Sequence, residues 1–215
     1  DHSLGWSVAV RGDRAVVGAY GAGQDANTGA AYVFDAASGF QKMKLTASDG
    51  ASLNLLGNSV AIEGATAVAG APLHDTNGLI YSGAAYVFDV TTGQELLKLT
   101  AANPLAGDSF GASAAIRGNR ILIGCPKSDD LGVDSGSVYV FDLATGQQLA
   151  KLTASDGAPE DRFGSSLAAH GDRVLVGARL GSGGQGAVYV FDINTGQELE
   201  KLSAAELDSA IEEKK

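Results

Sequence analysis

The stretch "DSFGASAAIRGNRILIGCP", residues 108–126, has near-copies at three other places in this 215-residue chain. Residues 161–178 read "DRFGSSLAAHGDRVLVGA", residues 54–72 read "NLLGNSVAIEGATAVAGAP", and residues 4–19 read "LGWSVAVRGDRAVVGA". The copies are spaced 52, 54 and 53 residues apart, measured between Gly5, Gly57, Gly111 and Gly164. A period this regular indicates a fold made of repeated structural units.

Each copy predicts a β-hairpin, because two apolar runs flank a polar centre. The four centres, Arg-Gly-Asp-Arg, Glu-Gly-Ala-Thr, Arg-Gly-Asn-Arg and His-Gly-Asp-Arg, all supply a glycine where a tight turn needs positive φ. A second hairpin follows a loop of variable sequence. It begins with "GAAYVFD" at 29–35 and 83–89, "GSVYVFD" at 136–142 and "GAVYVFD" at 186–192, and turns through Ser-Gly or Thr-Gly. Each repeat is therefore one four-stranded antiparallel sheet.

A sheet of this size has two apolar faces and cannot bury both alone, so identical sheets must stack around an axis. The predicted fold is all-β: a β-propeller of four four-stranded antiparallel blades, with a short C-terminal helix. We expect the small residues of the first strand to lie near the axis and the Tyr-Val-Phe of the third strand to fill the space between blades. The expected propeller covers 1–204, with blades at about 4–54, 55–108, 109–162 and 163–204, and a helical tail at 205–215.

The tail "SAAELDSAIEEKK" departs from the repeat. Ser203 and Glu206 form a capping-box pattern, and Leu207 and Ile211 share one helical face. We expect a short helix that caps a blade edge or, alternatively, docks a partner.

Four whole blades leave the closure of the ring open. The chain either closes as a small four-blade ring, remains an open array, or is part of a larger ring that is completed by a second copy or by missing sequence.

Composition limits the classes of partner. The formal net charge is -10, so the long-range field repels nucleic acid phosphates and anionic membrane surfaces. No apolar run approaches the roughly 18 residues of a membrane helix, and the single cysteine, Cys125, cannot form an intramolecular disulfide. The first residue is Asp1 rather than Met, which suggests that a signal peptide, a propeptide or an upstream region is missing. We expect an extracytoplasmic location: secreted, cell surface, periplasm or organelle lumen.

The repeat resembles a known family at its most distinctive residues. Phe110-Gly111 and Phe163-Gly164, with Gly70-Ala71-Pro72 and the variant Gly124-Cys125-Pro126, resemble the FG-GAP repeat of the integrin α-subunit propeller and of many bacterial and eukaryotic surface proteins. The segments "KLTASDGA" at 44–51 and 151–158 are similar to a bacterial-type branch. Repeats one and two have Leu4 and Leu56 for Phe, and repeats one and four read Gly-Ala-Tyr and Gly-Ala-Arg for Gly-Ala-Pro. The resemblance implies a role in protein binding or cell adhesion.

The resemblance also implies candidate calcium loops, because FG-GAP loops in integrins carry calcium. Hard cations need several converging oxygens, and the variable loop of each repeat offers some of them. The candidate ligands are Asp25, Asn27, Asp75, Asn77, Asp129, Asp130 and Asp134. None of these loops holds a complete ligand set, and repeat four reads "GSGGQG" instead. The alternative is that these are solvated polar loops.

A second set of polar residues recurs between repeats. The pairs, each five residues apart, are Asp49 with Asn54, Asn103 with Asp108, and Asp156 with Asp161. A catalytic site would occur once, so recurrence favours a structural role, and we expect these side chains to accept backbone N–H bonds in the turn before the FG glycine. Calcium binding by these residues is the lesser alternative.

No catalytic constellation emerges from the sequence. Nucleophilic catalysis needs a nucleophile, a base and an orienting group, and the three histidines, His2, His74 and His170, lie at turns or the terminus of different repeats. Cys125 replaces the Ala of the GAP motif and is expected to be a buried thiol. We predict a non-catalytic binding or assembly module that holds a protein or glycan ligand on its variable loops. The alternatives are a structural subunit of a large complex and a propeller-based hydrolase or lyase domain.

Overall fold

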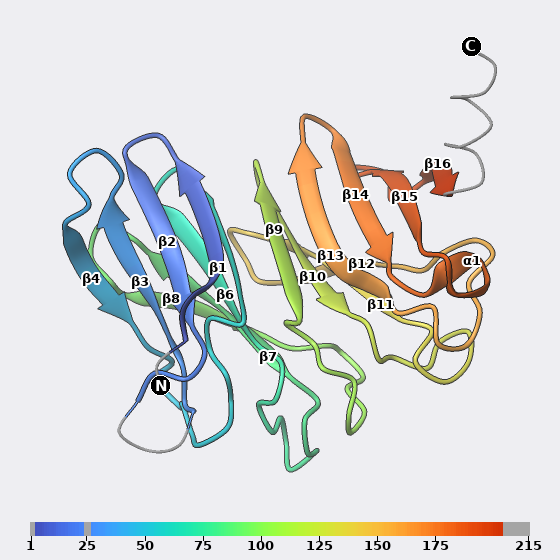
Figure 1. Ribbon diagram of the computed structural model, residues 1–215, viewed down its shortest axis with the longest axis horizontal. Coiled ribbons are helices and arrows are strands. Elements are labelled where there is room, and N and C mark those ends of the chain that lie inside the picture. Colours follow the sequence, from blue (N-terminus) through green and yellow to red (C-terminus); the bar gives the residue numbers. More distant parts are fainter. Residues whose placement is uncertain (1–2, 24–26, 204–215) are drawn as a thin grey trace.

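The computed structural model describes residues 3–23 and 27–203 and confirms the four-blade prediction (Figure 1). It contains four separate sheets, each with four antiparallel strands in chain order. Blade 1 comprises β1 (Leu4–Arg11), β2 (Arg14–Ala19), β3 (Ala30–Asp35) and β4 (Gln41–Leu45). Blade 2 comprises β5 (Ser59–Glu63), β6 (Thr66–Ala71), β7 (Ala84–Asp89) and β8 (Glu95–Leu99).

The second half of the chain repeats this arrangement. Blade 3 comprises β9 (Ser113–Arg117), β10 (Arg120–Cys125), β11 (Ser137–Asp142) and β12 (Gln148–Leu152). Blade 4 comprises β13 (Phe163–His170), β14 (Arg173–Ala178), β15 (Ala187–Asp192) and β16 (Glu198–Ser203), with the one-turn α1 (Gly181–Gly184) between β14 and β15. The predicted tail helix at 205–215 lies outside the described residues, and no described helix is long and apolar enough to cross a membrane.

The turn between the third and fourth strands of each blade is fixed by its aspartate, as predicted. The Asp35 carboxylate accepts hydrogen bonds from the backbone N–H of Ser38 at 2.8 Å and from its hydroxyl at 2.7 Å. Asp142 accepts the corresponding bonds from Thr145 at 3.0 and 3.1 Å. Local hydrogen bonds of this kind set the register of the outer hairpin in each blade.

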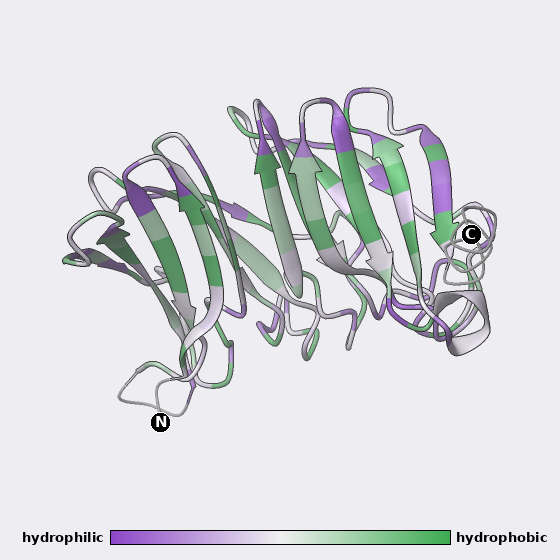
Figure 2. Cartoon of the chain, turned by 45° about the horizontal axis from the view of Figure 1, so that its top comes forward, coloured by the Kyte–Doolittle hydropathy of each residue, from purple (hydrophilic) through white to green (hydrophobic). Residues whose placement is uncertain are grey.

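The core lies between the blades. Tyr86 and Phe88 of β7 are completely buried and belong to one apolar cluster with Val16 and Val33 of blade 1. Hydrophobic residues run along the strands, while polar residues gather near the hairpin ends (Figure 2). The expectation that the Tyr-Val-Phe strand fills the space between blades is therefore confirmed.

Successive blades are joined by a recurring contact, which we call the junction. In each junction the FG segment of the following blade, namely Leu56–Gly57, Phe110–Gly111 or Phe163–Gly164, sits against the preceding blade. We call it the incoming FG segment, and we call the part of the preceding blade that it contacts the receiving site. In each junction an inner-strand serine hydroxyl donates to the carbonyl of the FG glycine: Ser7 to Gly57 at 2.8 Å, Ser59 to Gly111 at 2.9 Å, and Ser113 to Gly164 at 2.7 Å. A parallel β-bridge accompanies each bond, pairing Gly29 with Leu56, Gly83 with Phe110, and Gly136 with Phe163.

The junction requires a glycine in the second strand of the preceding blade. A Cβ added to Gly70 would lie 2.0 Å from the Gly111 carbonyl oxygen, and one added to Gly124 would lie 2.1 Å from the Gly164 carbonyl oxygen. Since real Cβ atoms do not approach backbone this closely, any side chain here must push the blades apart. The glycine of the Gly-Ala-Pro motif is therefore a packing requirement.

The four blades form an open array. The inner strands contact one another in the order β1, β5, β9, β13, and β1 and blade 4 lie at opposite ends of the row (Figure 1). The outward face of β1 is uncovered, with Leu4, Val8 and Val10 exposed by 58%, 69% and 68%. Of the arrangements considered from the sequence, a single chain therefore adopts the open array.

The junction glycine gives a first test. Gly70→Ala should lower the free energy of unfolding by about 3 kcal/mol, because the added methyl group overlaps the Gly111 carbonyl. Gly177→Ala occupies the same position of blade 4, where the nearest atoms belong to the Ser166 side chain, so it should change stability by less than about 1 kcal/mol. Urea unfolding in dilute solution measures both, and equal losses would contradict the junction as described.

Candidate binding surface at the loop end

Two kinds of loop meet at one end of the array, which we call the loop end. One kind connects the second and third strands of each blade, and the other connects successive blades; both lie at the bottom of Figure 1. The opposite end carries only short hairpin turns. Because the variable segments of the repeat all fall in these loops, the loop end is where the blades differ most.

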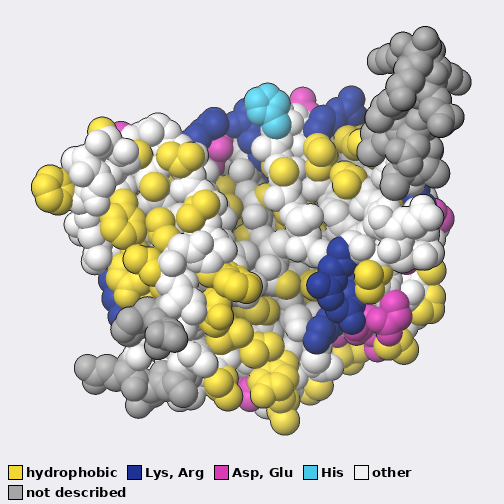
Figure 3. Space-filling view, viewed as in Figure 1, with side chains coloured by type: hydrophobic (Ala, Val, Ile, Leu, Met, Phe, Trp, Pro, Cys, Tyr) yellow, Lys and Arg dark blue, Asp and Glu magenta, His cyan; other side chains and the backbone are white. Residues whose placement is uncertain are grey.

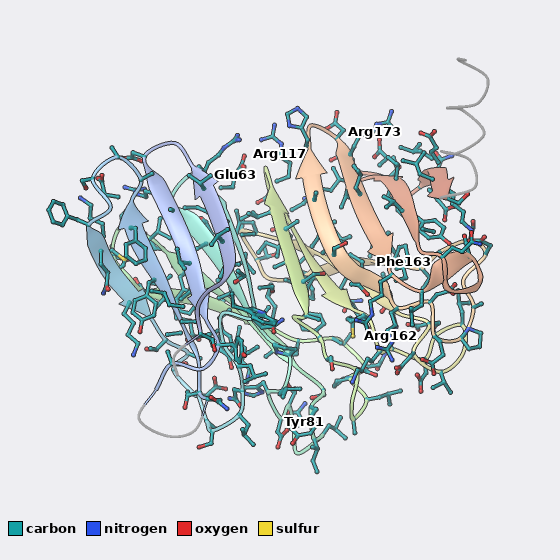
Figure 4. The ribbon with its side chains drawn as sticks, viewed as in Figure 1. Glu63, Tyr81, Arg117, Arg162, Phe163 and Arg173 are labelled. Carbon is teal, nitrogen blue, oxygen red and sulfur yellow. The ribbon has the colours of Figure 1, made fainter. Side chains whose placement is uncertain are left out.

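A cationic pocket of about 370 Å³ lies at the loop end, lined by residues of blades 2, 3 and 4. Its positive charges are Lys127, Arg162 and Arg179. Lys and Arg side chains gather on this face, with acidic side chains beside them, in the region where Figure 4 places Arg162 (Figures 3 and 4). We call these three residues and their surroundings the cationic pocket.

Each of the three cations departs from the repeat. The residues at the position of Lys127 in the other blades are Gly21, Leu73 and Leu180. Those at the position of Arg162 are Ser3, Leu55 and Ser109, and those at the position of Arg179 are Tyr20, Pro72 and Pro126. A role in holding blades together would recur in every repeat, so the repeat itself does not require these cations.

The backbone holds Arg162 in place. Its φ is +56°, close to the left-handed values of Leu55 and Ser109 at the same position. Its N–H donates to the carbonyl of Asp134 at 3.0 Å, while its own carbonyl accepts from the N–H of Ser165 at 3.2 Å. The junction geometry thus fixes the direction in which the arginine leaves the chain.

The pocket keeps part of its positive charge uncompensated. The Arg162 guanidinium lies 3.3 Å from Asp134 and 3.5 Å from Glu160, but its Nε is buried and has no hydrogen-bond partner. Lys127 and Arg179 are exposed and form no ion pair with any side chain of the described ranges 3–23 and 27–203. In a chain of net charge -10, this concentrates cations at one point.

Exposed apolar side chains lie in the same loops. Ile80 and Tyr81 in the loop of blade 2 are 58% and 41% exposed, and Leu131 and Val133 in the loop of blade 3 are 44% and 62% exposed. Figure 4 shows Tyr81 near the tip of its loop. Exposed apolar side chains in the loops that also form a cationic pocket are typical of a surface that contacts another protein.

A second pocket, of about 550 Å³, lies between blades 1 and 2 and contains His74. The imidazole Nε2 is 3.4 Å from a carboxylate oxygen of Asp49 and 3.3 Å from the ammonium group of Lys98. The same carboxylate accepts hydrogen bonds from Lys98 at 2.5 Å and from the Tyr86 hydroxyl at 2.6 Å. His74 is buried, although it lies in the loop between β6 and β7.

Most of this network is structural, because it recurs without the histidine. Between blades 3 and 4, Asp156 accepts hydrogen bonds from the hydroxyl of Tyr189 at 2.8 Å and from Lys201 at 2.5 Å. Burial would raise the pKa of Asp49, but its hydrogen bonds from Lys98 and Tyr86 outweigh this and lower the pKa. Burial raises the pKa of Tyr86 far above its ordinary value, and the bond to Asp49 adds to this, so its hydroxyl stays protonated.

The aspartates of the recurring pairs between repeats have two different structural roles. Asp108 and Asp161 accept backbone N–H bonds from Leu105 at 2.8 Å and from Ala158 at 2.9 Å, as predicted for this turn. Asp49 and Asp156 instead tie each loop to the next blade. The sequence could not reveal this, because the tyrosine and lysine partners lie more than thirty positions further along the chain.

The loop carboxylates proposed for calcium are largely engaged within the protein. Asp75 and Asp129 each accept a backbone N–H bond across their loop at 2.9 Å, from Tyr81 and Asp134 respectively. Asp130 pairs with Lys151, Asp134 pairs with Arg162, and Asn27 and Asn77 adopt left-handed φ. Asp25 lies outside the described residues. Among the described residues no group of three or more His, Cys, Asp or Glu side chains lies close enough together to hold a metal ion.

Calcium binding stays a prediction of the resemblance. Thermal unfolding with CaCl₂ and then with chelator tests it: a rise in Tm that chelation reverses would show binding. Asp129→Asn should then weaken the effect, because it removes one ligand charge.

Cys125 is a buried free thiol, as expected. It is completely buried, its Sγ donates to the carbonyl of Asp108 at 3.3 Å, and burial raises its pKa well above the ordinary value. A protonated, buried thiol packs as a small apolar group and is a poor nucleophile.

These features define a class of protein: a repeat protein built of β-propeller blades, with a variable surface at the loop end. The FG-GAP repeat pattern matches the chain four times, at residues 1–34, 40–88, 94–141 and 147–191. The chain belongs to the FG-GAP repeat family.

A solved structure shares the fold. Hydrazine synthase of Kuenenia stuttgartiensis superimposes with a TM-score of 0.63 at 14% sequence identity. The alignment covers 94% of this chain and 50% of that chain, so this chain spans about half of its length. No curated protein matches the sequence.

The histidine pocket gives a pH prediction. Burial, and then the nearby Lys98 ammonium, lower the pKa of His74 below 6.5, so the unfolded chain takes up the proton first as the pH falls. The free energy of unfolding should therefore decrease as the pH falls through 6.5. His74→Ser, which places the residue found at Ser128 in blade 3, should reduce this decrease. Urea unfolding at about pH 7.5 and about pH 5.5 measures it, and an unchanged pH dependence in the variant would contradict the assignment.

Proposed function

We propose that this chain is a non-catalytic binding module that works outside the cytoplasm and recognises an acidic segment of a partner protein at its loop end. One observation carries the proposal: three cations that the repeat does not require meet in one pocket. The exposed Ile80, Tyr81 and Val133 in the same loops favour a protein partner with apolar as well as acidic side chains.

The scaffold supports this role. The junctions and the interblade core hold the blades rigidly, and the loops that differ most are placed together at one end. Recognition through variable loops on a rigid framework costs little conformational entropy on binding. A structural subunit of a large complex is the closest alternative and would use the same surface for docking.

A hydrolase or lyase domain is the second candidate, and the His74 pocket is the feature that favours it. Its neighbours are suited to structure instead: Tyr86 stays protonated, and the Asp–Tyr–Lys part recurs at the junction of blades 3 and 4. An activated nucleophile beside the imidazole would be needed for covalent catalysis.

Replacement of the cations tests the binding proposal. The double variant Lys127→Leu with Arg162→Ser uses residues that other blades carry at these positions, Leu73 and Ser109. Binding to a fluorescent peptide of alternating Glu and Leu should weaken about tenfold at low salt, because the variant removes two positive charges and a surface ion pair contributes up to about 1 kcal/mol. Fluorescence polarisation measures the affinity.

A matched control separates the pocket from general charge. Arg173→Thr removes a cation at the opposite end and places the residue that blade 2 carries there, Thr66. It should leave peptide affinity unchanged. Equal weakening by Arg173→Thr, or no weakening by the double variant, would refute the cationic pocket as the binding site.

A further inference from the structure

Blade 4 carries a copy of the receiving site that no described residue fills. In each internal junction the receiving site contains an inner-strand serine, the glycine of the second strand and the glycine that precedes the third strand. The corresponding residues of blade 4 are Ser166, Gly177 and Gly186, and all three line a pocket of about 400 Å³. The pocket thus lies where an incoming FG segment would sit.

Within the described residues, Ser166 of this receiving site lacks the interblade hydrogen bond that its counterparts make. Ser166 is exposed, and within the described part of the chain its hydroxyl makes no hydrogen bond, whereas Ser59 and Ser113 are buried and bonded to the next blade. The nearest atoms to a Cβ built on Gly177 belong to Ser166 rather than to the backbone of another blade. Glycine is thus present where only an approaching carbonyl would require it.

Blade 1 presents the matching FG segment. Its FG segment is Leu4–Gly5, in which Gly5 has a φ of +93° and the N–H of Trp6 donates to the carbonyl of Ser3 at 3.3 Å. This is the turn that the FG segments of the other blades make inside their junctions. A Cβ built on Gly5 would meet no atom within 4 Å. The FG segment of blade 1 therefore has the turn conformation of the others, but no described residue packs against Gly5.

Within the described part of the chain, the sheet faces beside these two sites are apolar and exposed. On blade 1, Leu4, Val8 and Val10 are exposed, although their counterparts in blade 2 are buried against the preceding blade. On blade 4, Leu175 is 40% exposed, while its counterparts in the other blades are fully buried; these are Val16, Val68 and Leu122. Each end of the array is therefore one half of a junction.

We infer that a second copy of this chain completes both halves, with blade 1 of each copy seated on blade 4 of the other. The FG segment of blade 1 and the receiving site of blade 4 lie at opposite ends of the row, so they do not meet within one chain (Figure 1). Two identical head-to-tail contacts related by a twofold axis close a ring of eight blades, which is within the range of known propellers. In this ring the Ser166 hydroxyl donates to the Gly5 carbonyl of the partner copy. Arg179 lines the pocket of blade 4 as well as the cationic pocket, but the pairing needs neither its charge nor a ligand at the loop end.

Solution mass with two single variants tests the pairing. The unchanged chain should have the mass of two chains by light scattering at micromolar concentration. Gly177→Ala places a methyl group in the path of the incoming Gly5 carbonyl, and Val10→Arg places a charge on the opposite half of the junction. Each variant alone should return the mass to that of one chain while the circular dichroism spectrum stays unchanged.

A control and the opposing outcomes are well separated. Leu149→Arg alters an exposed residue of β12 outside the junction faces and should keep the mass of two chains. A single-chain mass for the unchanged protein would overturn the inference. Sensitivity to Val10→Arg without sensitivity to Gly177→Ala would also overturn it, because blade 1 would then pair with blade 1. Lys127→Leu with Arg162→Ser should keep the paired mass, so failure of the loop-end proposal is distinguishable.

Discussion

The whole arrangement depends on one close approach of two backbones. At each junction the carbonyl of an FG glycine lies so near the second strand of the preceding blade that only glycine fits there, and a serine hydroxyl secures the contact. Because the contact is made by backbone and by two small residues, it holds the blades at a fixed spacing whatever the loops contain. The apolar faces then pack between sheets that are already aligned.

This constraint explains why the fold could be predicted from the sequence. The glycines of the repeat, the Tyr-Val-Phe strand and the Asp turn each have one structural purpose, and four copies made the pattern unmistakable. What the sequence did not reveal was contact across blades. The pairing of Asp49 with Tyr86 and Lys98, and the burial of His74, arise from residues distant in sequence, and no local pattern predicts them.

The cationic pocket was missed for a different reason. Lys127 and Arg162 do not form a motif, and each is an ordinary charged residue in its own segment. A comparison of the same position in all four repeats would have found them, because Ser or Leu stands where Arg162 does. In a repeat protein, the residues that differ at one position carry information that is lost when the chain is read from end to end.

The left-handed residue before each FG glycine has a consequence for how such surfaces are composed. Ser3, Leu55, Ser109 and Arg162 all adopt this backbone conformation, with φ between +49° and +59°. A non-glycine residue there costs on the order of 1 kcal/mol, yet glycine would leave the position without a side chain. The repeat thus provides one fixed attachment point per blade, and exchanging a single amino acid at each can give the rim a new chemical character while the framework beneath it is preserved.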